Sequence, residues 1–337
     1  MKKALIIGIW ALFLLLVSFK RKDIIPFNVP KGWPQPVYNF KKKPLTAEKI
    51  NLGRTLFYDP ALSKDSTISC NSCHSQFSSF THADHALSHG IAGKIGNRNS
   101  PVLINLAWSS HFMWDGSITH LNEQAKLPIT NPLEMDENMD SVVSRLQQDI
   151  RYRSLFSMAF EDSVATEEKM LEALTQFMLT LVSTNSKYDR VMAAQDTFTA
   201  NELRGYTLFK AHCSSCHTEP LFTNDGFENN GLYVDETLND FGRIKITHTP
   251  ADSLKFKVPT LRNIEYSKPY MHDGRFKTLS QVINSYMRGI QHSPTLSPKL
   301  QKMIYLDEQQ KNDLIAFLLT LSDKDFIHNK RFAYCSK

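Results

Sequence analysis

Two copies of one short motif carry the most specific chemistry in this sequence. Each has two cysteines three positions apart and a histidine directly after the second: Cys70-x-x-Cys73-His74 and Cys213-x-x-Cys216-His217. Cysteines at this spacing can form thioether bonds to the two vinyl groups of a haem, and the adjacent histidine then reaches the iron. A structural zinc site would instead need paired C-x-x-C units around one tetrahedron. The motifs therefore predict two covalently bound haem c groups, with His74 and His217 as iron ligands.

The composition is that of an ordinary globular protein. The 337 residues are 42% hydrophobic and 22% charged, which allows two domains that each bury a core. The net charge of +5 comes from scattered lysines and gives no indication of nucleic-acid binding. Four of the five cysteines belong to the haem motifs, so no disulfide framework is expected, and Cys335 is predicted to be a free surface thiol.

The first residues have the pattern of an export signal. Lys2 and Lys3 precede 16 apolar positions, residues 4–19, and three basic residues follow. This apolar run is shorter than the roughly 20 residues that a spanning helix prefers. Residues 1–22 are therefore either a cleaved signal peptide or a retained anchor in the inner membrane. Either alternative predicts a periplasmic protein, and the prolines of residues 23–44 indicate an extended linker.

The chain contains an internal duplication around the two haem motifs. Gly53-x-Thr55-Leu56-Phe57 precedes the first motif, and Gly205-x-Thr207-Leu208-Phe209 precedes the second. Further along, Asp115-Gly116 and Asp273-Gly274 each end a segment that starts at an equivalent proline, Pro101 or Pro259. Two related domains explain both matches.

The predicted fold is mainly α-helical, with two cytochrome-c-like haem domains and few short β segments. We expect the domains at residues 45–197 and 198–325, with a tail over 326–337. Apolar residues at three- and four-residue spacing predict helices over 141–149, 167–183 and 308–321. The last of these helices could fold back onto the first domain.

The duplication also allows a comparison of the distal sides of the two haems, opposite the motif histidines. Twelve positions after Gly116 stands Pro128, and twelve after Gly274 stands Tyr286. Proline cannot bind iron but a tyrosine phenolate can, which predicts an open first haem and a second haem closed by Tyr286. Met287 and Met271 are alternative ligands, and Tyr286 could equally be a packed helix aromatic.

Peroxide chemistry at an open iron needs a nearby base that moves a proton between the two oxygens. Glu134 is the candidate base, Gln124 a hydrogen-bonding neighbour, and Trp114 a relay between the haems. Each also has an ordinary explanation, as a surface carboxylate, a polar side chain or a core aromatic. The neighbouring Asp136 and Glu137 weaken the assignment of Glu134.

At these residues the chain resembles the bacterial dihaem cytochrome c peroxidase superfamily, which includes the MauG enzymes. The resemblance covers about residues 45–325. Besides the haem motifs, it is carried by Asn99-x-Pro101, Phe112-Met113-Trp114-Asp115-Gly116, Glu123-Gln124-Ala125, Asn131-Pro132-x-Glu134-Met135, Pro259-Thr260-Leu261-Arg262-Asn263 and Pro269-Tyr270-Met271-His272-Asp273-Gly274.

The resemblance implies a low-potential, peroxide-reducing haem at His74 and a high-potential, electron-accepting haem at His217. Trp114 matches the tryptophan between the haems, and Gln124 and Glu134 match the distal amide and the catalytic acid. A calcium ion between the domains is also implied. Its matching ligands are Asn99, Ser267 and Pro269, the last two through backbone carbonyls, and such oxygen ligation suits Ca²⁺.

Two departures from ordinary peroxidases of this superfamily change the expected mechanism. Tyr286 stands where they carry an axial methionine, which is the MauG-like state and would lower the potential of the second haem. Ile91 stands where they carry a loop histidine that closes the resting first haem, while His82, His85 and His89 are out of register. We therefore expect a first haem that is open without reductive activation.

The leading interpretation is a dihaem peroxidase that reduces hydrogen peroxide to water. Its electrons would come from a small redox protein, either a cytochrome c or a cupredoxin. One alternative is a MauG-like oxidase of a partner protein's side chains, and another is a dihaem electron carrier without catalysis. The sequence leaves the donor and the oligomeric state open, a homodimer being one option.

Overall fold

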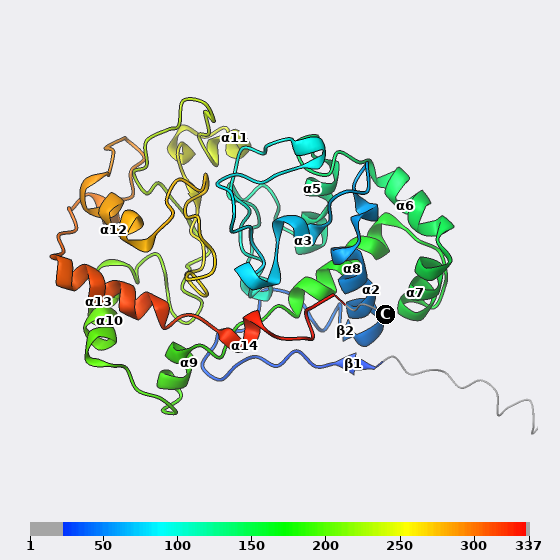
Figure 1. The fold of residues 1–337 in the computed structure, drawn as a ribbon, viewed down its shortest axis with the longest axis horizontal. Helices are drawn as coiled ribbons and strands as arrows, with labels where there is room; N and C mark the ends of the chain where they lie inside the picture. Colours follow the sequence, from blue (N-terminus) through cyan, green and yellow to red (C-terminus); the bar gives the residue numbers. More distant parts are fainter. Residues whose placement is uncertain (1–22, 335–337) are drawn as a thin grey trace, which may run out of the picture.

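The computed structural model describes residues 23–334, so the predicted export signal and Cys335 lie outside the described residues. Figure 1 shows two helical lobes side by side, with few strands. Each haem motif lies in its own lobe, as the duplication predicts. The predicted fold class, two cytochrome-c-type domains in a mainly α chain, is confirmed.

The first lobe contains seven helices and a two-stranded antiparallel sheet of β1 (Ile24–Ile25) and β2 (Leu45–Thr46). Its helices are α2 (Ala47–Tyr58), α3 (Cys70–Cys73), α4 (Leu121–Gln124), α5 (Lys126–Thr130), α6 (Met139–Gln148), α7 (Ile150–Phe160) and α8 (Glu167–Leu179). Single 3₁₀ turns are η1 (Pro60–Leu62), η2 (Gln76–Ser78), η3 (Ile91–Gly93) and η4 (Leu106–Trp108).

The second lobe begins with α9 (Lys187–Met192) and has a second small antiparallel sheet of β3 (Phe227–Glu228) and β4 (Phe256–Lys257). Its other helices are α10 (Ala200–His212), α11 (Ile244–Thr247), α12 (Leu279–Arg288) and α13 (Glu308–Leu319), with 3₁₀ turns η5 (Pro250–Asp252) and η6 (Pro298–Leu300). The chain ends with α14 (Lys324–Ile327), which returns toward the first lobe (Figure 1).

The repeated glycines explain how each lobe is built. Helix α2 crosses α8 so closely that a Cβ on Gly53 would lie 1.8 Å from the carbonyl oxygen of Ala173. A Cβ on Gly205 of α10 would lie 1.9 Å from the carbonyl oxygen of Asp313 on α13. Only glycine permits this approach, so the repeated glycine marks the tightest helix crossing in each lobe.

The duplication extends to backbone details. Asn105 and Asn263 both adopt left-handed backbone, with φ of 56° and 60°. The amide oxygen of Asn105 accepts from the Ser183 N–H at 2.9 Å, and that of Asn263 accepts from the Asp323 N–H at 2.7 Å. Each asparagine thus fixes the chain shortly after α8 or α13, and asparagine tolerates this backbone better than most residues.

Two predictions about the ends of the chain are wrong. Helix α13 does not fold onto the first lobe, because Leu314 and Phe317 are buried in the core of the second. The segment from residue 326 is not a separate tail either, since Phe326, Ile327 and Phe332 belong to the core of the first lobe. Apolar side chains buried this way, rather than position in the sequence, decide which lobe a segment joins.

The proline-rich segment 23–44 is extended but does not behave as a free linker. Its aromatic side chains pack against the first core, and Trp33 meets Trp108 edge-on with ring centroids 4.9 Å apart. The Trp108 indole N–H donates to the carbonyl of Pro34 at 2.8 Å. No helix within residues 23–334 is long and apolar enough to cross a membrane.

The close approach of α10 and α13 predicts the effect of adding a side chain at Gly205. Gly205→Ala should lower the free energy of unfolding by about 1–3 kcal/mol, because the added methyl group must displace the backbone of α13. Thermal unfolding of the haem-loaded protein measures this. Thr207→Ala, on the exposed side of the same helix, is the matched control. An unchanged midpoint for Gly205→Ala would contradict the crossing geometry.

Candidate haem sites and the cavity between the domains

The first haem motif forms the short helix α3 and the turn after it. A reciprocal capping box joins Ser69 and Ser72, and the His74 N–H donates to the carbonyl of Cys70 at 2.9 Å. The His74 Nδ1 lies 2.9 Å from the carbonyl oxygen of Phe80. A carbonyl can only accept, so Nδ1 carries the proton and Nε2 is free to bind a metal.

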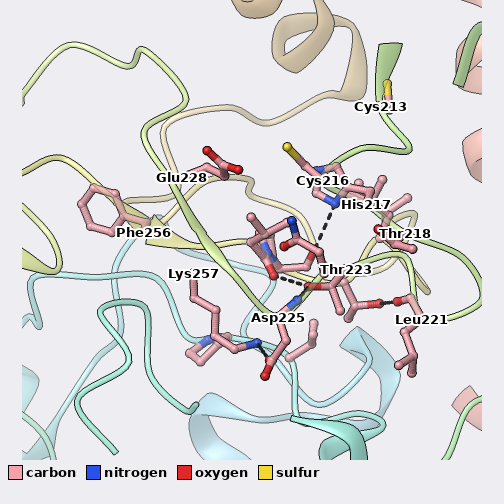
Figure 2. A pocket seen from close by; sticks show the side chains of 18 of the residues that line it. Cys213, Cys216, His217, Thr218, Leu221, Thr223, Asp225, Glu228, Phe256 and Lys257 are labelled. Carbon is pink, nitrogen blue, oxygen red and sulfur yellow. Dashed lines mark hydrogen bonds and ion pairs between the residues drawn. The ribbon is translucent and has the colours of Figure 1, made fainter. Parts of the chain in front are cut away.

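The second motif follows α10 and repeats this arrangement. The His217 N–H donates to the carbonyl of Cys213 at 2.9 Å. Its Nδ1 lies 3.1 Å from the carbonyl oxygens of both Phe222 and Pro259. Figure 2 shows Cys216 and His217 on one segment of the pocket wall. Burial lowers the pKa of His74 and of His217 to about 4, so both imidazoles are neutral, as an iron ligand must be.

These residues fit a covalently bound haem. None of the four cysteines of the two motifs forms a disulfide, so all four are available for thioether bonds. Cys213, Cys216 and His217 line a cavity of about 990 Å³, which also reaches first-lobe residues. This volume is at the upper end of the range for small-molecule and cofactor pockets. At the second motif the cysteines, the oriented imidazole and the cavity together match the requirements of haem c, and the first motif repeats the cysteines and the oriented imidazole.

Tyr286 lies on α12 and lines the same cavity as His217. Burial raises the pKa of its phenol to about 12. Met271 also lines the cavity, and its sulfur accepts from the Asn230 amide at 3.6 Å. Met287 is different, because it is buried in the core of the second lobe. Of the three candidate ligands, Tyr286 and Met271 thus face the cavity.

The predicted distal residues of the first haem lie on and after α4 and α5. Gln124 is buried and lines the cavity, with its amide 3.8 Å from the sulfur of Met113. Glu134 is half-buried and accepts from the Asn131 amide at 2.9 Å, and burial raises its pKa. The Cys73 sulfur lies 3.5 Å from the carbonyl oxygen of His89, and the N–H of Ile91, two residues further on, donates to the Glu134 carbonyl, so Glu134 lies near the first haem motif.

The loop that carries Ile91 is hydrogen-bonded to the backbone of Glu134. The Ile91 N–H donates to the Glu134 carbonyl at 2.9 Å, and Gly90 packs so closely that a Cβ would lie 2.1 Å from the carbonyl oxygen of Leu133. Ile91 is buried and offers no ligand atom. The rings of His85 and His89 gather nearby, with centroids 4.2 Å apart.

Trp114 meets its repeat equivalent across the domain boundary. Its ring lies edge-on to His272 with centroids 6.5 Å apart, and His272 stacks on Phe256 at 3.7 Å. The Trp114 indole N–H donates to the Asn99 carbonyl at 2.7 Å, and the Asn99 N–H donates to the His272 carbonyl at 2.7 Å. The two equivalent rings therefore meet where the duplicated halves join.

The sequence interpretation missed the charges that frame this junction. Arg98 binds both carboxylate oxygens of Asp240, at 2.6 and 3.0 Å, and also Asp115 at 2.6 Å. Arg98 directly precedes Asn99 of the recognised motif, and Asp115 follows Trp114. Arg98 and Asp115 could have been identified from the sequence, because each adjoins a motif residue. Asp240 lies in a long loop of the second lobe, and no sequence pattern pointed to it.

The three predicted calcium ligands line the cavity together. Asn99 donates its amide N–H to the carbonyl of Ala86 at 2.9 Å, which leaves the amide oxygen for another partner. Ser267 and Pro269 line the same cavity. Within the described residues, no group of three or more His, Cys, Asp or Glu could hold a metal ion. The calcium site therefore stays a prediction, built on one amide and two carbonyls.

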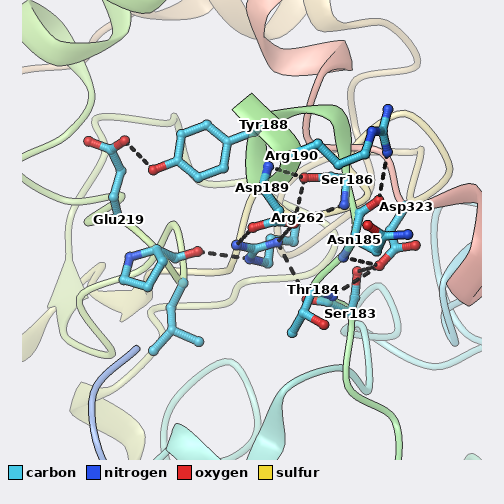
Figure 3. Close-up of polar contacts among 12 residues, drawn as sticks. Ser183, Thr184, Asn185, Ser186, Tyr188, Asp189, Arg190, Glu219, Arg262 and Asp323 are labelled. Atoms are coloured by element: carbon cyan, nitrogen blue, oxygen red, sulfur yellow. Dashed lines mark hydrogen bonds and ion pairs between the residues drawn. The ribbon is translucent and has the colours of Figure 1, made fainter. Parts of the chain in front are cut away.

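A buried polar network lies behind the second motif (Figure 3). The fully buried Arg262 binds both oxygens of Asp189, at 2.7 and 2.8 Å, and donates to the Pro220 carbonyl at 2.8 Å. Asp323 accepts from the Ser183 hydroxyl at 3.0 Å. These bonds tie the interdomain segment to the second haem loop and to the C-terminal segment. A buried guanidinium is tolerated only when it is paired and bonded in this way.

Comparison with known proteins gives one consistent result. A family model described as di-haem cytochrome c peroxidase matches residues 47–197, and one described as cytochrome c matches residues 203–322. The chain is 37% identical to the methylamine utilization protein MauG of Methylorubrum extorquens over 308 residues, 88% of this chain and 83% of that protein. It is also 37% identical to the cytochrome c551 peroxidase of Nitrosomonas europaea, over 83% of this chain and 81% of that protein.

Among solved structures, the chain is similar to a MauG-like protein associated with microbial copper homeostasis. The TM-score is 0.83 at 33% sequence identity, and the match covers 92% of this chain and 99% of the other. The dihaem peroxidase BthA of Burkholderia thailandensis has a TM-score of 0.74 at 21% identity, which supports the shared fold.

The residues that line the cavity predict which substitution changes the spectra of the second haem. Tyr286→Phe should alter its ferric absorption and electron paramagnetic resonance spectra, because a phenyl ring cannot bind iron. Met287→Leu, in the core, is the matched control and should leave both spectra unchanged. If Met271→Leu changed the spectra and Tyr286→Phe did not, the ligand would be Met271.

Proposed function

The chain belongs to the di-haem cytochrome c peroxidase and MauG family, whose members are redox enzymes, and from this premise we propose that it is a dihaem peroxidase. It reduces hydrogen peroxide to water at the first haem, with electrons delivered through the second haem by an external redox protein. The single observation that carries this proposal is the half-buried carboxylate of Glu134 beside the first haem motif.

Glu134 has the properties of a catalytic base. When bound, the first haem supplies an iron atom that binds peroxide and exchanges electrons. The Glu134 carboxylate takes the proton from one peroxide oxygen and delivers it to the other, so that water can leave. Asn131 holds one carboxylate oxygen by its amide, and the buried amide of Gln124 is available to orient the peroxide.

The surroundings of Glu134 support an open first haem. Ile91, which is hydrogen-bonded to the Glu134 backbone, presents an apolar side chain where ordinary relatives carry a ligand histidine. Pro128, at the repeat position of Tyr286, offers no ligand either. Peroxide therefore meets no protein ligand that must first leave.

Trp114 is proposed as the relay between the two haems. Its ring contacts His272 from the other lobe, and a hydrogen bond to Asn99 fixes its orientation. A calcium ion held by Asn99, Ser267 and Pro269 would stabilise the same junction. We also propose export to the periplasm, with a small cytochrome c or a cupredoxin as the donor.

A MauG-like oxidase is the second candidate function. Tyr286 in the wall of the cavity favours it, as do the relatives named MauG. In this function the same peroxide reaction would withdraw electrons from side chains of a partner protein instead of from a small carrier. The arrangement around Glu134 argues against the third candidate, a non-catalytic electron carrier.

Glu134→Gln should slow peroxide consumption by about 100-fold or more, the effect expected for loss of a general base. The base must be deprotonated, and burial raises the pKa of Glu134 above its ordinary value. The wild-type rate should therefore rise with pH across this raised pKa, and the variant should lose this rise. Glu123→Gln, an exposed carboxylate on α4, is the control. Unchanged turnover in Glu134→Gln would rule out Glu134 as the catalytic base.

A donor experiment separates the two enzymatic functions. We expect ferric protein that has never been reduced to consume peroxide, and then to oxidise a reduced small cytochrome c or cupredoxin rapidly. Stopped-flow absorption measures both steps. Rapid peroxide consumption with slow donor oxidation would favour the MauG-like function, and peroxide that only bleaches the haems would contradict an open first haem.

A further inference from the structure

Two tyrosines of the second lobe share one carboxylate oxygen. The Tyr188 hydroxyl donates to Oε1 of Glu219 at 2.5 Å, and the Tyr206 hydroxyl donates to the same oxygen at 2.8 Å. Lys210 lies 3.3 Å from the other oxygen, Oε2. Figure 3 shows the bond between Tyr188 and Glu219. Each phenol therefore has a proton acceptor in hydrogen-bond contact.

This tyrosine pair connects the second haem site to the surface. Glu219 stands two residues after His217 and lines the cavity. Tyr188 is buried with its ring 4.8 Å from that of Phe222, whose carbonyl accepts from His217. Tyr206 lies 6.3 Å from Tyr188 and is only half-buried. The rings form a continuous path from the histidine side of the second haem to solvent.

The fold itself does not require this arrangement. Two residues after His74, where the second motif has Glu219, the first has Gln76. After Gly53, at the position of Tyr206, stands Arg54. Gln76 and Arg54 donate to backbone carbonyls of the C-terminal segment, an ordinary structural use of polar side chains. The equivalent positions of the first lobe thus fold without two tyrosines on one carboxylate, and among the described residues this shared arrangement occurs at Glu219.

We propose that Tyr188 and Tyr206, with Glu219 as their shared proton acceptor, form a redox-active pair that carries oxidising equivalents between the second haem and the protein surface. This rests on the proposed peroxide reaction, which supplies the oxidant. One phenol gives an electron toward the second haem and its proton to Glu219, leaving a neutral tyrosyl radical and a carboxylic acid. An external one-electron donor at the surface restores the phenol, and the proton returns from Glu219.

The protonation states agree with this role. Burial, followed by Glu219, raises the pKa of Tyr206 to about 12, and the same causes hold the pKa of Tyr188 well above its usual value. Both phenols are therefore protonated at neutral pH. A phenol becomes strongly acidic when it loses an electron, so a carboxylate already in contact lets the proton move together with the electron.

The test is electron paramagnetic resonance of haem-loaded protein, frozen after mixing with hydrogen peroxide without a donor. We expect a tyrosyl radical signal that is lost in the double variant Tyr188→Phe/Tyr206→Phe and strongly reduced in Glu219→Gln, whose amide cannot accept the proton. Tyr152→Phe is the matched control. Tyr152 also donates to a carboxylate, Asp59 at 2.7 Å, but lies in the core of the first lobe.

The outcomes separate this inference from the proposed function. Normal peroxide consumption with no tyrosyl signal, or with a signal unchanged in the double variant, would overturn the tyrosine pair alone. Failure to consume peroxide would overturn both. Haem content and the ferric spectrum of each variant, expected to match the wild type, exclude misfolding as the cause of a lost signal.

Discussion

The hydrogen bond from each haem-motif imidazole to a backbone carbonyl is the constraint on which the rest of the structure depends. It fixes the proton on Nδ1 and aims Nε2 at the iron position, which a free histidine would not do. The acceptors, Phe80 and Phe222, both lie at left-handed backbone, with φ of 56° and 55°. Such turns hold only where packing fixes them, and both side chains are fully buried. Core packing in each lobe therefore sets the direction of its iron ligand.

A duplicated scaffold with this constraint can change chemistry by single residues. Equivalent positions hold Pro128 or Tyr286 on the distal side and Gln76 or Glu219 behind the histidine. None of these exchanges alters the helix crossings at Gly53 and Gly205, because all four positions lie outside the crossing helices α2, α8, α10 and α13. In the proposed function, such exchanges leave one lobe open to peroxide and suit the other to electron transfer.

The sequence predicted what is local or repeated, and it failed where distant segments meet. The C-x-x-C-H motifs and the glycine repeats follow from spacing, and Tyr286 follows from the duplication, whereas the roles of Gln124, Asn99, Ser267 and Pro269 were implied by the family resemblance. The packing of residues 326–332 onto the first core could not be predicted, because a short apolar segment fits either lobe equally well. The same holds for Arg98 with Asp240 and for Tyr188 with Glu219, whose partners are separated by 142 and 31 residues. Hydrogen bonds between distant residues leave no periodic pattern.

The placement of charge decides where electrons and protons can travel. At the junction, Arg98 forms ion pairs with Asp115 and Asp240. Trp114 and His272 therefore meet beside paired charges and not beside an unpaired charge. Near the first haem motif, Glu134 accepts from the Asn131 amide and forms no ion pair within residues 23–334, and burial raises its pKa. A carboxylate paired with arginine would give up its proton too readily to return it to the departing oxygen. In the proposed function, the contrast between the paired carboxylates at the junction and the carboxylate of Glu134 beside the motif would separate electron transfer from proton transfer.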